Sequence, residues 1–158
     1  MTIAMEHPVQ TADPADLPSP EVVERLTRRI TTDHPDIDTP MARRIVAQTA
    51  AFLAASGHAP GQSLAPSKLV DVGWHTFILH TVDHADFCQR VAGRFIHHVP
   101  TDEPKEIPGG PAEARGRTLI AITAAGYTVD TELWPELADC SQCHAGCSDS
   151  PNSGKGKK

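Results

Sequence analysis

The sequence lacks three features that would assign the protein to a large functional class. Its apolar runs fall far short of the roughly twenty residues that a membrane-spanning helix needs, so no membrane partner is expected. The net charge is -6 and no long basic stripe occurs, which argues against nucleic acid as a partner. The first residues, MTIAMEHPVQ, have neither a basic start nor an apolar core, so we expect no secretory signal and a cytoplasmic location.

Cysteine is also scarce, with four residues in a chain of 158. In a reducing compartment these thiols stay mostly reduced, so structural disulfides are not expected. Four thiols in such a compartment favour metal binding or redox chemistry instead. A chain of this length forms one domain whose core needs no disulfide support.

Helix start signals and apolar periodicity predict an all-α fold. Ser19-Pro20 and Thr39-Pro40 each resemble an N-cap followed by proline at the first helical position. Apolar residues then recur with helical spacing, and further helices are expected after Ser67 and over residues 112–125. The helix after Ser67 is apolar on nearly all sides, so we expect it to be the buried central element.

The composition divides the chain into a helical domain and two tails. Residues 1–18 carry three prolines and no periodicity, and residues 138–158 are mostly Ser, Cys, Gly and Lys, so both are expected to be disordered. The domain between them, 19–137, is expected to be a compact orthogonal bundle of four or five helices. The inner face predicted for the helix over 112–125 consists of Leu119, Ile120, Ile122 and Thr123.

Metal-binding side chains are concentrated between Asp71 and Pro100. These thirty residues hold one of the four cysteines, Cys88, and five of the nine histidines: His75, His80, His84, His97 and His98. The surrounding residues are apolar, and polar side chains that cost free energy to bury need a reason to lie in a core. Metal binding is one such reason. Ordinary hydrogen-bonded histidines of the core or surface are the alternative.

Which of these side chains meet depends on whether the helix is continuous. In an unbroken helix His80, His84 and Cys88 lie along one face and approach a common ion pairwise. Asp71 and His75 share another face, which suits a carboxylate that orients a ligand imidazole. The side chains of His75 and Cys88 would then point in opposite directions, roughly 20 Å apart along the axis.

The sequence also contains a possible break in this helix. Thr81 followed by Asp83 resembles an N-cap with an acidic first turn. If a new helix starts at Thr81, His75 and Cys88 converge on one pocket together with the pair at 97–98. The chain must then turn near Thr81.

A longer pattern across this stretch resembles a known family. The order Asp-x-x-Trp-His-x-x-x-Leu-x-Thr, followed by Phe-Cys, Gly and His-His-x-Pro, is similar to the shared core of the glycine-rich domain-containing proteins. The resemblance covers residues 65–100, and 39–137 loosely, and implies a helical domain like that of short actinobacterial relatives. His84 stands where relatives usually carry an aromatic residue and His80 is variable, which favours the broken helix. The positions that match are Asp71, Trp74, His75, Cys88 and His98.

Helix phase and this resemblance together predict a metal site formed by Asp71, His75, Cys88 and His98. Zinc is the expected ion, because imidazole, thiolate and carboxylate are its usual ligands. Asp71 either binds the ion or orients an imidazole. Three protein ligands with an open position can activate water for hydrolysis, whereas a closed shell is structural. No substrate is indicated.

A second group of metal-binding side chains lies in the C-terminal tail. Its C-x-x-C-H spelling is that of c-type haem attachment, which we reject because no export signal precedes it. Three thiolates and an imidazole within eight residues instead suit Zn²⁺ or Cu(I). Incidental thiols on a flexible tail are the alternative. The four residues are Cys140, Cys143, His144 and Cys147.

Three functions therefore remain open from the sequence. The first is a zinc-binding domain, with or without catalytic activity. The second is a metal carrier or sensor, in which the Cys-rich tail captures an ion that the histidine site receives. The third is an interaction module with a polar core network, or a leader whose Cys-rich C-terminus another enzyme modifies.

Overall fold

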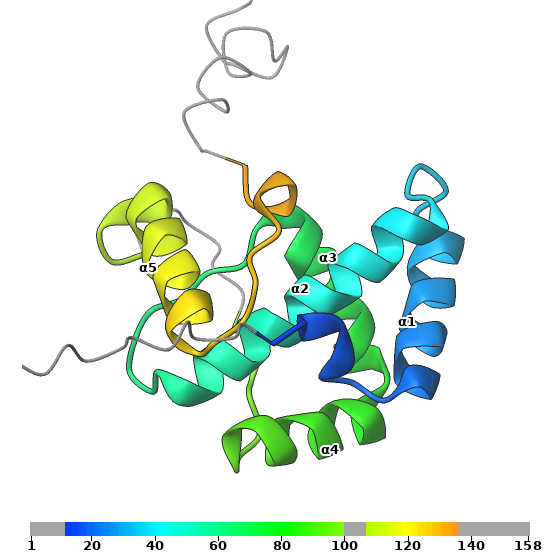
Figure 1. Cartoon of the computed structure of the whole chain (residues 1–158), viewed down its shortest axis with the longest axis horizontal. Coiled ribbons are helices and arrows are strands. Elements are labelled where there is room, and N and C mark those ends of the chain that lie inside the picture. Colours follow the sequence, from blue (N-terminus) through cyan, green and yellow to red (C-terminus); the bar gives the residue numbers. More distant parts are fainter. Residues whose placement is uncertain (1–11, 100–106, 136–158) are drawn as a thin grey trace, which may run out of the picture.

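The computed structural model describes residues 12–99 and 107–135. Within these ranges the chain forms five α-helices and contains no β-strand, so the predicted all-α fold is confirmed (Figure 1). No helix in these ranges is long and apolar enough to cross a membrane. The helices are α1 (Pro20–Asp33), α2 (Thr39–His58), α3 (Lys68–Leu79), α4 (Thr81–Ala92) and α5 (Gly110–Ala124), with short 3-10 helices η1 (Pro14–Asp16) and η3 (Thr131–Leu133).

The first three α-helices begin where polar caps predict them. Ser19 and Ser67 each accept a hydrogen bond from a backbone N–H of the first turn of α1 and α3. The cap of α2 is Asp38, one residue before the expected Thr39, and its Oδ1 accepts from the Met41 amide at 2.9 Å. Proline occupies the first turn of α1 and α2, where a backbone N–H would have no partner within the helix, so its absence costs no hydrogen bond.

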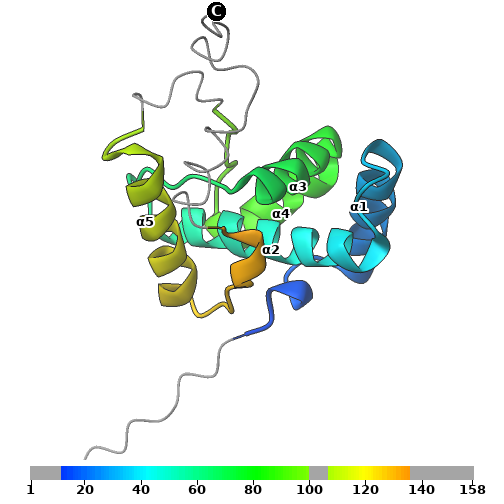
Figure 2. The same cartoon turned by 90° about the horizontal axis from the view of Figure 1, so that it is seen from above.

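The central element of the fold is α2, so the prediction that α3 occupies this place is wrong. Both views show α2 running through the middle, with the other helices around it (Figures 1 and 2). Its alanines at positions 50, 51, 54 and 55 are buried, and these small side chains let neighbours approach from several sides. By contrast, α3 exposes His75 and Leu79.

The helices α2 and α3 approach each other closely at Gly73. A Cβ atom at this position would lie 2.1 Å from Oγ1 of Thr49 and 2.9 Å from Cγ2 of Ile45. The buried Thr49 hydroxyl lies 2.8 Å from the Ile45 carbonyl oxygen and 3.1 Å from that of Val70, so it links both helices. This contact fixes where α3 stands on α2.

The face of α5 that packs on α2 agrees only in part with the predicted one, since Ile122 is buried and Leu119 is partly buried against the core. Its buried residues are Ala114, Thr118, Ala121 and Ile122. Ile120 is 71% exposed, and Thr123 is exposed as well. The buried stripe begins at Ala114 and is built mainly from small residues, which carry little hydrophobic signal in the sequence. The Thr118 hydroxyl belongs to this stripe because it bonds to the backbone of Ala65.

Ordered structure begins before the expected domain boundary at residue 19. Asp13 caps η1 by accepting from the Ala15 amide at 2.9 Å, and η1 packs on α2. The remaining residues of the two predicted tails, 1–11 and 138–158, lie outside the described residues.

Candidate metal centre

Three of the four predicted ligands meet beside the middle of α3. Asp71 and His75 are one turn apart on the same face of this helix. The chain leaves α4 at Gly93 and returns past α3, bringing His98 against Asp71. The donor atoms of Asp71, His75 and His98 all lie within 4.8 Å of one another. We call these three residues the Asp71 cluster.

The Asp71 carboxylate bridges the two imidazoles of the cluster. Its Oδ1 lies 2.9 Å from Nε2 of His98, and its Oδ2 lies 3.2 Å from Nδ1 of His75. Nδ1 of His75 is also 2.9 Å from the Asp71 carbonyl oxygen. When Nδ1 carries the proton and donates it there, Nε2 of His75 keeps a free lone pair.

The cluster has one buried wall and one open side. The side chain of His98 is 14% exposed, whereas that of His75 is 58% exposed. Trp74 packs edge-on against the His98 ring, with 4.5 Å between ring centroids, and rests on Phe52 from below. A cleft of about 450 Å³ opens over the cluster, and Lys68 also lines it. An ion held here would therefore be accessible to solvent.

The cluster depends on the turn between α3 and α4, which the sequence correctly predicts near Thr81. The first helix ends at Leu79 and the second begins at Thr81. The connecting residue is His80, with φ -94° and ψ 68°, and no side-chain hydrogen bond caps α4. His80 is therefore the N-cap in place of the expected Thr81. Its own Nδ1 lies 3.0 Å from the Thr76 carbonyl oxygen, away from the cluster.

Cys88 does not join the Asp71 cluster, contrary to the expectation from the sequence. Its Sγ lies 3.6 Å from Nε2 of His84, one turn earlier on α4, and both side chains are buried. Among the His, Cys, Asp and Glu residues in the described ranges, the one group of three or more with converging donors is the Asp71 cluster. After the turn, α4 presents Cys88 to the core.

The pair of His84 and Cys88 is held in its neutral form. Burial lowers the pKa of His84, and a charge on His97 lowers it further. Burial also raises the pKa of the Cys88 thiol, against smaller opposing effects of the Ile96 backbone and Arg94. Both shifts disfavour charge, so the pair is not an activated thiolate and imidazolium.

The other predicted metal-binding residues have different positions. His97 packs on Phe95, with 4.7 Å between ring centroids, and lines the cleft without joining the cluster. The second site expected in the tail lies outside the described residues, and its binding of Zn²⁺ or Cu(I) stays a prediction. Its residues are Cys140, Cys143, His144 and Cys147.

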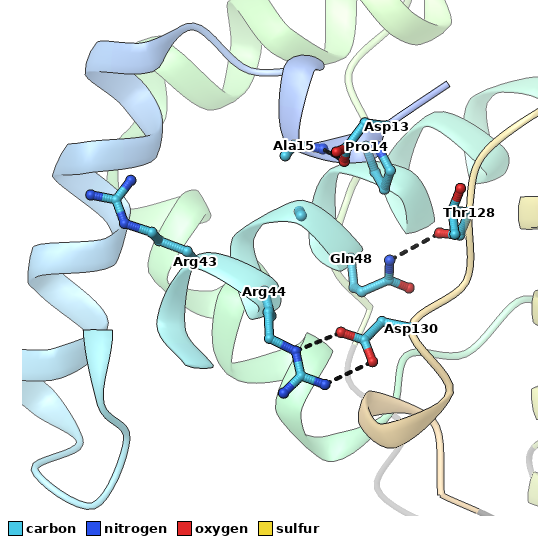
Figure 3. A pocket seen from close by; sticks show the side chains of 9 residues that line it. Asp13, Pro14, Ala15, Arg43, Arg44, Gln48, Thr128 and Asp130 are labelled. Atoms are coloured by element: carbon cyan, nitrogen blue, oxygen red, sulfur yellow. Dashed lines mark hydrogen bonds and ion pairs between the residues drawn. The ribbon is translucent and has the colours of Figure 1, made fainter. Parts of the chain in front are cut away.

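A larger hollow of about 520 Å³ lies between α2 and the chain after α5 (Figure 3). Its polar groups bind one another. Arg44 makes two bonds to the Asp130 carboxylate, at 2.7 and 2.9 Å, and Gln48 donates to the Thr128 carbonyl oxygen at 3.0 Å. These bonds to Asp130 raise the pKa of Arg44, and Arg44 lowers the pKa of Asp130. These bonds attach the chain after α5 to α2 and leave the polar groups with partners, so this hollow is a weaker candidate for a functional site than the Asp71 cluster.

Comparison with known proteins identifies a family for most of this domain. A family model described as UCP032817-like matches residues 16–107, more than half of the chain. The matched range includes α1 to α4 and the whole Asp71 cluster. No curated protein and no solved structure matches the chain.

This match corrects the resemblance drawn from the sequence. The glycine-rich domain-containing family is not the one that the comparison finds, so that assignment is wrong. It depended on a short motif in which Trp74 and Cys88 are core residues. Buried aromatic and small residues recur at helical spacing in many unrelated helical domains, so they discriminate poorly between families.

Proposed function

The chain belongs to the UCP032817-like family, and we propose that the domain it shares with that family binds one zinc ion through the Asp71 cluster. The observation that carries this proposal is the convergence of one carboxylate and two imidazoles within 4.8 Å. These groups are common zinc ligands. We further propose that the protein is cytoplasmic, where thiols in its tail stay reduced.

The spacing of the donors supports a single ion. Zinc binds nitrogen and oxygen at roughly 2.0–2.2 Å in a tetrahedral arrangement, which separates the donor atoms by about 3.4 Å. The donors of the Asp71 cluster lie within 4.8 Å of one another, which is close to this spacing. For Nε2 of His98 to bind the ion, a proton held between it and Asp71 Oδ1, 2.9 Å away, would have to move to Nδ1 of the ring or be released to solvent.

The open side of the cluster supports a site with a free coordination position. Three protein ligands leave room for one water molecule, which is the arrangement of catalytic rather than structural zinc. His75 and the cleft above it leave that position accessible. A zinc ion held by these residues would lower the pKa of a bound water molecule, which is the chemistry that hydrolysis needs. We name no substrate for this domain.

A metal-free polar network is the competing explanation. Asp71 already pairs with both imidazoles, so the three side chains have partners without an ion. In that case the domain is an interaction module or a leader for modification of the tail. A carrier function needs the additional tail site, with Cys140, Cys143 and Cys147 as soft ligands.

Metal analysis of untagged, full-length protein separates these functions. We expect one zinc ion per chain that is lost in His75→Ala and in His98→Ala. The matched control is His58→Ala, because His58 is another exposed helix histidine whose Nδ1 lies 2.8 Å from the carbonyl oxygen four residues earlier. Protein that takes up no zinc at micromolar concentration would rule the proposal out.

A truncation separates the domain site from the tail site. Removal of residues 139–158 should leave the zinc of the Asp71 cluster in place. If instead all of the metal is lost with the tail, the ion belongs to the cysteines and the carrier function is favoured.

A further inference from the structure

A second cavity adjoins the cleft of the Asp71 cluster. It measures about 210 Å³, and its walls are largely apolar, with Leu69, Ile107 and Trp134 among them. The cavity and the cleft share five lining residues, which are Ala65, Pro66, Ser67, Lys68 and Ile107. The two hollows therefore meet at the first turn of α3.

The first turn of α3 attracts negative charge. The backbone N–H groups that begin a helix lack partners within it and carry a partial positive charge. Ser67 caps the Val70 amide at 3.2 Å, which leaves the amides of Lys68 and Leu69 in the turn without a bond from this cap. The Lys68 side chain is exposed and lines both hollows. The side chain of Lys68 and the N-terminus of α3 therefore both lie at the edge of the apolar cavity.

We propose that this place binds an amphiphilic monocarboxylate, with its head group at the N-terminus of α3 beside Lys68 and its apolar body in the cavity. The volume of about 210 Å³ accommodates on the order of seven water-sized groups at ~30 Å³ each. That size matches a chain of roughly six to eight carbon atoms. Burial of such a chain contributes about 0.8 kcal/mol per CH₂ group before the costs of binding.

The charges around the site favour one negative charge on the ligand. Lys68 and the helix N-terminus together supply about one and a half positive charges at the head-group position. The guanidinium of Arg115 also lines the cavity, but it is bonded to the Trp134 carbonyl oxygen at the other end. Asp71 lies one turn further along α3 and repels a second negative charge. A phosphate monoester should therefore bind more weakly than a carboxylate of equal chain length.

The apolar end of the cavity is formed in advance. Trp134 donates from Nε1 to Oε1 of Gln48 at 2.8 Å, and its carbonyl oxygen accepts from Nε of Arg115 at 2.9 Å. A ligand then meets a fixed wall and does not have to order it, which reduces the cost of binding. The site needs no metal, so it is independent of the proposed zinc binding.

The test is calorimetric titration of full-length protein with octanoate in the presence of a chelator. We expect saturable binding of one octanoate per chain, with octanol and octyl phosphate each at least about fivefold weaker. Octanoate that does not bind at millimolar concentration overturns the proposal. If octanol binds as tightly as octanoate, the charged head group has no role in binding. If octyl phosphate binds as tightly as octanoate, the site has no preference for a carboxylate.

Two variants locate the site. Ile107→Asn places a polar group in the cavity and should weaken octanoate binding at least about tenfold, whereas Ile120→Asn, the same change at an exposed position of α5, should have no effect. Lys68→Met, at an exposed residue that folding does not require, should reduce the affinity for octanoate to that for octanol. Equal affinities of the Ile107 and Ile120 variants would place any binding elsewhere. His75→Ala should lose zinc and keep octanoate, so failure of one proposal is distinguishable from failure of the other.

Discussion

Gly73 and Thr49 approach so closely that no methyl group fits between α3 and α2, since a Cβ at Gly73 would lie 2.1 Å from the Thr49 hydroxyl oxygen. Gly73 stands two residues after Asp71 and two before His75 on the same helix. The contact therefore sets the height and rotation at which α3 presents the Asp71 cluster. The packing of α3 on α2 and the position of the candidate site therefore both depend on the contact between Gly73 and Thr49.

Gly73→Ala should destabilise the fold. The added Cβ must displace Thr49 or Ile45, and overpacking of this kind costs typically about 1–3 kcal/mol in the free energy of unfolding. Urea denaturation followed by circular dichroism measures the change. The control is Gly116→Ala on α5, where an added Cβ meets nothing within 4 Å and should stabilise the helix by up to about 1 kcal/mol. Equal effects of the two changes would contradict the close contact.

Zinc should raise the melting temperature of the wild-type protein. At a free zinc concentration of 100 times the Kd, binding to the native state alone adds about 2.7 kcal/mol. The increase should be absent in His98→Ala and retained in Cys88→Ala, because Cys88 lies against His84 and not in the cluster. A zinc response that depends on Cys88 would restore the ligand set expected from the sequence. Lower pH should weaken the response, since protons compete for the imidazoles.

His84 should make the protein sensitive to acid. Its folded pKa is lowered, so below the unfolded value of 6.5 the unfolded chain takes up a proton that the native state does not. The contribution of neutral His84 to the free energy of unfolding is fully present above that pH. As the pH falls, it decreases by up to about 1.4 kcal/mol per pH unit until the folded pKa is reached. The groups facing His84 are His97 and Cys88.

The measurement is the urea midpoint of unfolding between pH 7.5 and 5. His84→Gln should reduce the slope of stability against pH, although it lowers stability at every pH. His58→Gln, on the exposed end of α2, should keep the wild-type slope. An unchanged slope in His84→Gln would show that another group controls the acid response.

Gln48→Met should loosen the attachment of the chain after α5. It removes the acceptor of the buried Trp134 indole and the donor to the Thr128 carbonyl. An unsatisfied buried group costs about 1–3 kcal/mol, and this cost falls on the indole, because Trp134 is buried whereas Thr128 is exposed. The loss should appear both in urea denaturation and in the fluorescence of Trp134. Ala47→Met, at the adjacent half-buried position, is the control and should leave the fluorescence unchanged.

Much of the fold follows from local sequence signals. Ser19, Pro20 and Ser67 mark helix starts because capping depends on residues within one turn. The turn near Thr81 was predictable because Thr81 followed by Asp83 resembles an N-cap with an acidic first turn. Identifying α2 as the centre was not, because its alanines look unremarkable in the sequence while their small size is what admits neighbours.

The candidate site was predicted in part for a physical reason. Asp71 and His75 share a helix face, and helical periodicity alone pairs them. The position of Cys88 depends on the rotation of α4 about its axis after the turn, which packing against the core decides. The contact of Cys88 with His84 is an i, i+4 pair that helical periodicity predicts, although the family pattern had suggested that His84 was dispensable. What leaves no local pattern is the burial of this pair in the core, away from the Asp71 cluster.

The bridge between Asp71 and His98 spans 27 positions of sequence, and the whole of α4 lies between its ends. An ion bound by both Asp71 and His98 would therefore cross-link the two ends of the segment that contains α4. The two equilibria are coupled reciprocally. If binding of the ion favours the docked position of α4 by some factor, then undocking of α4 lowers the affinity for the ion by the same factor. Amide hydrogen exchange in α4 thus reports on occupancy of a site to which that helix contributes no ligand.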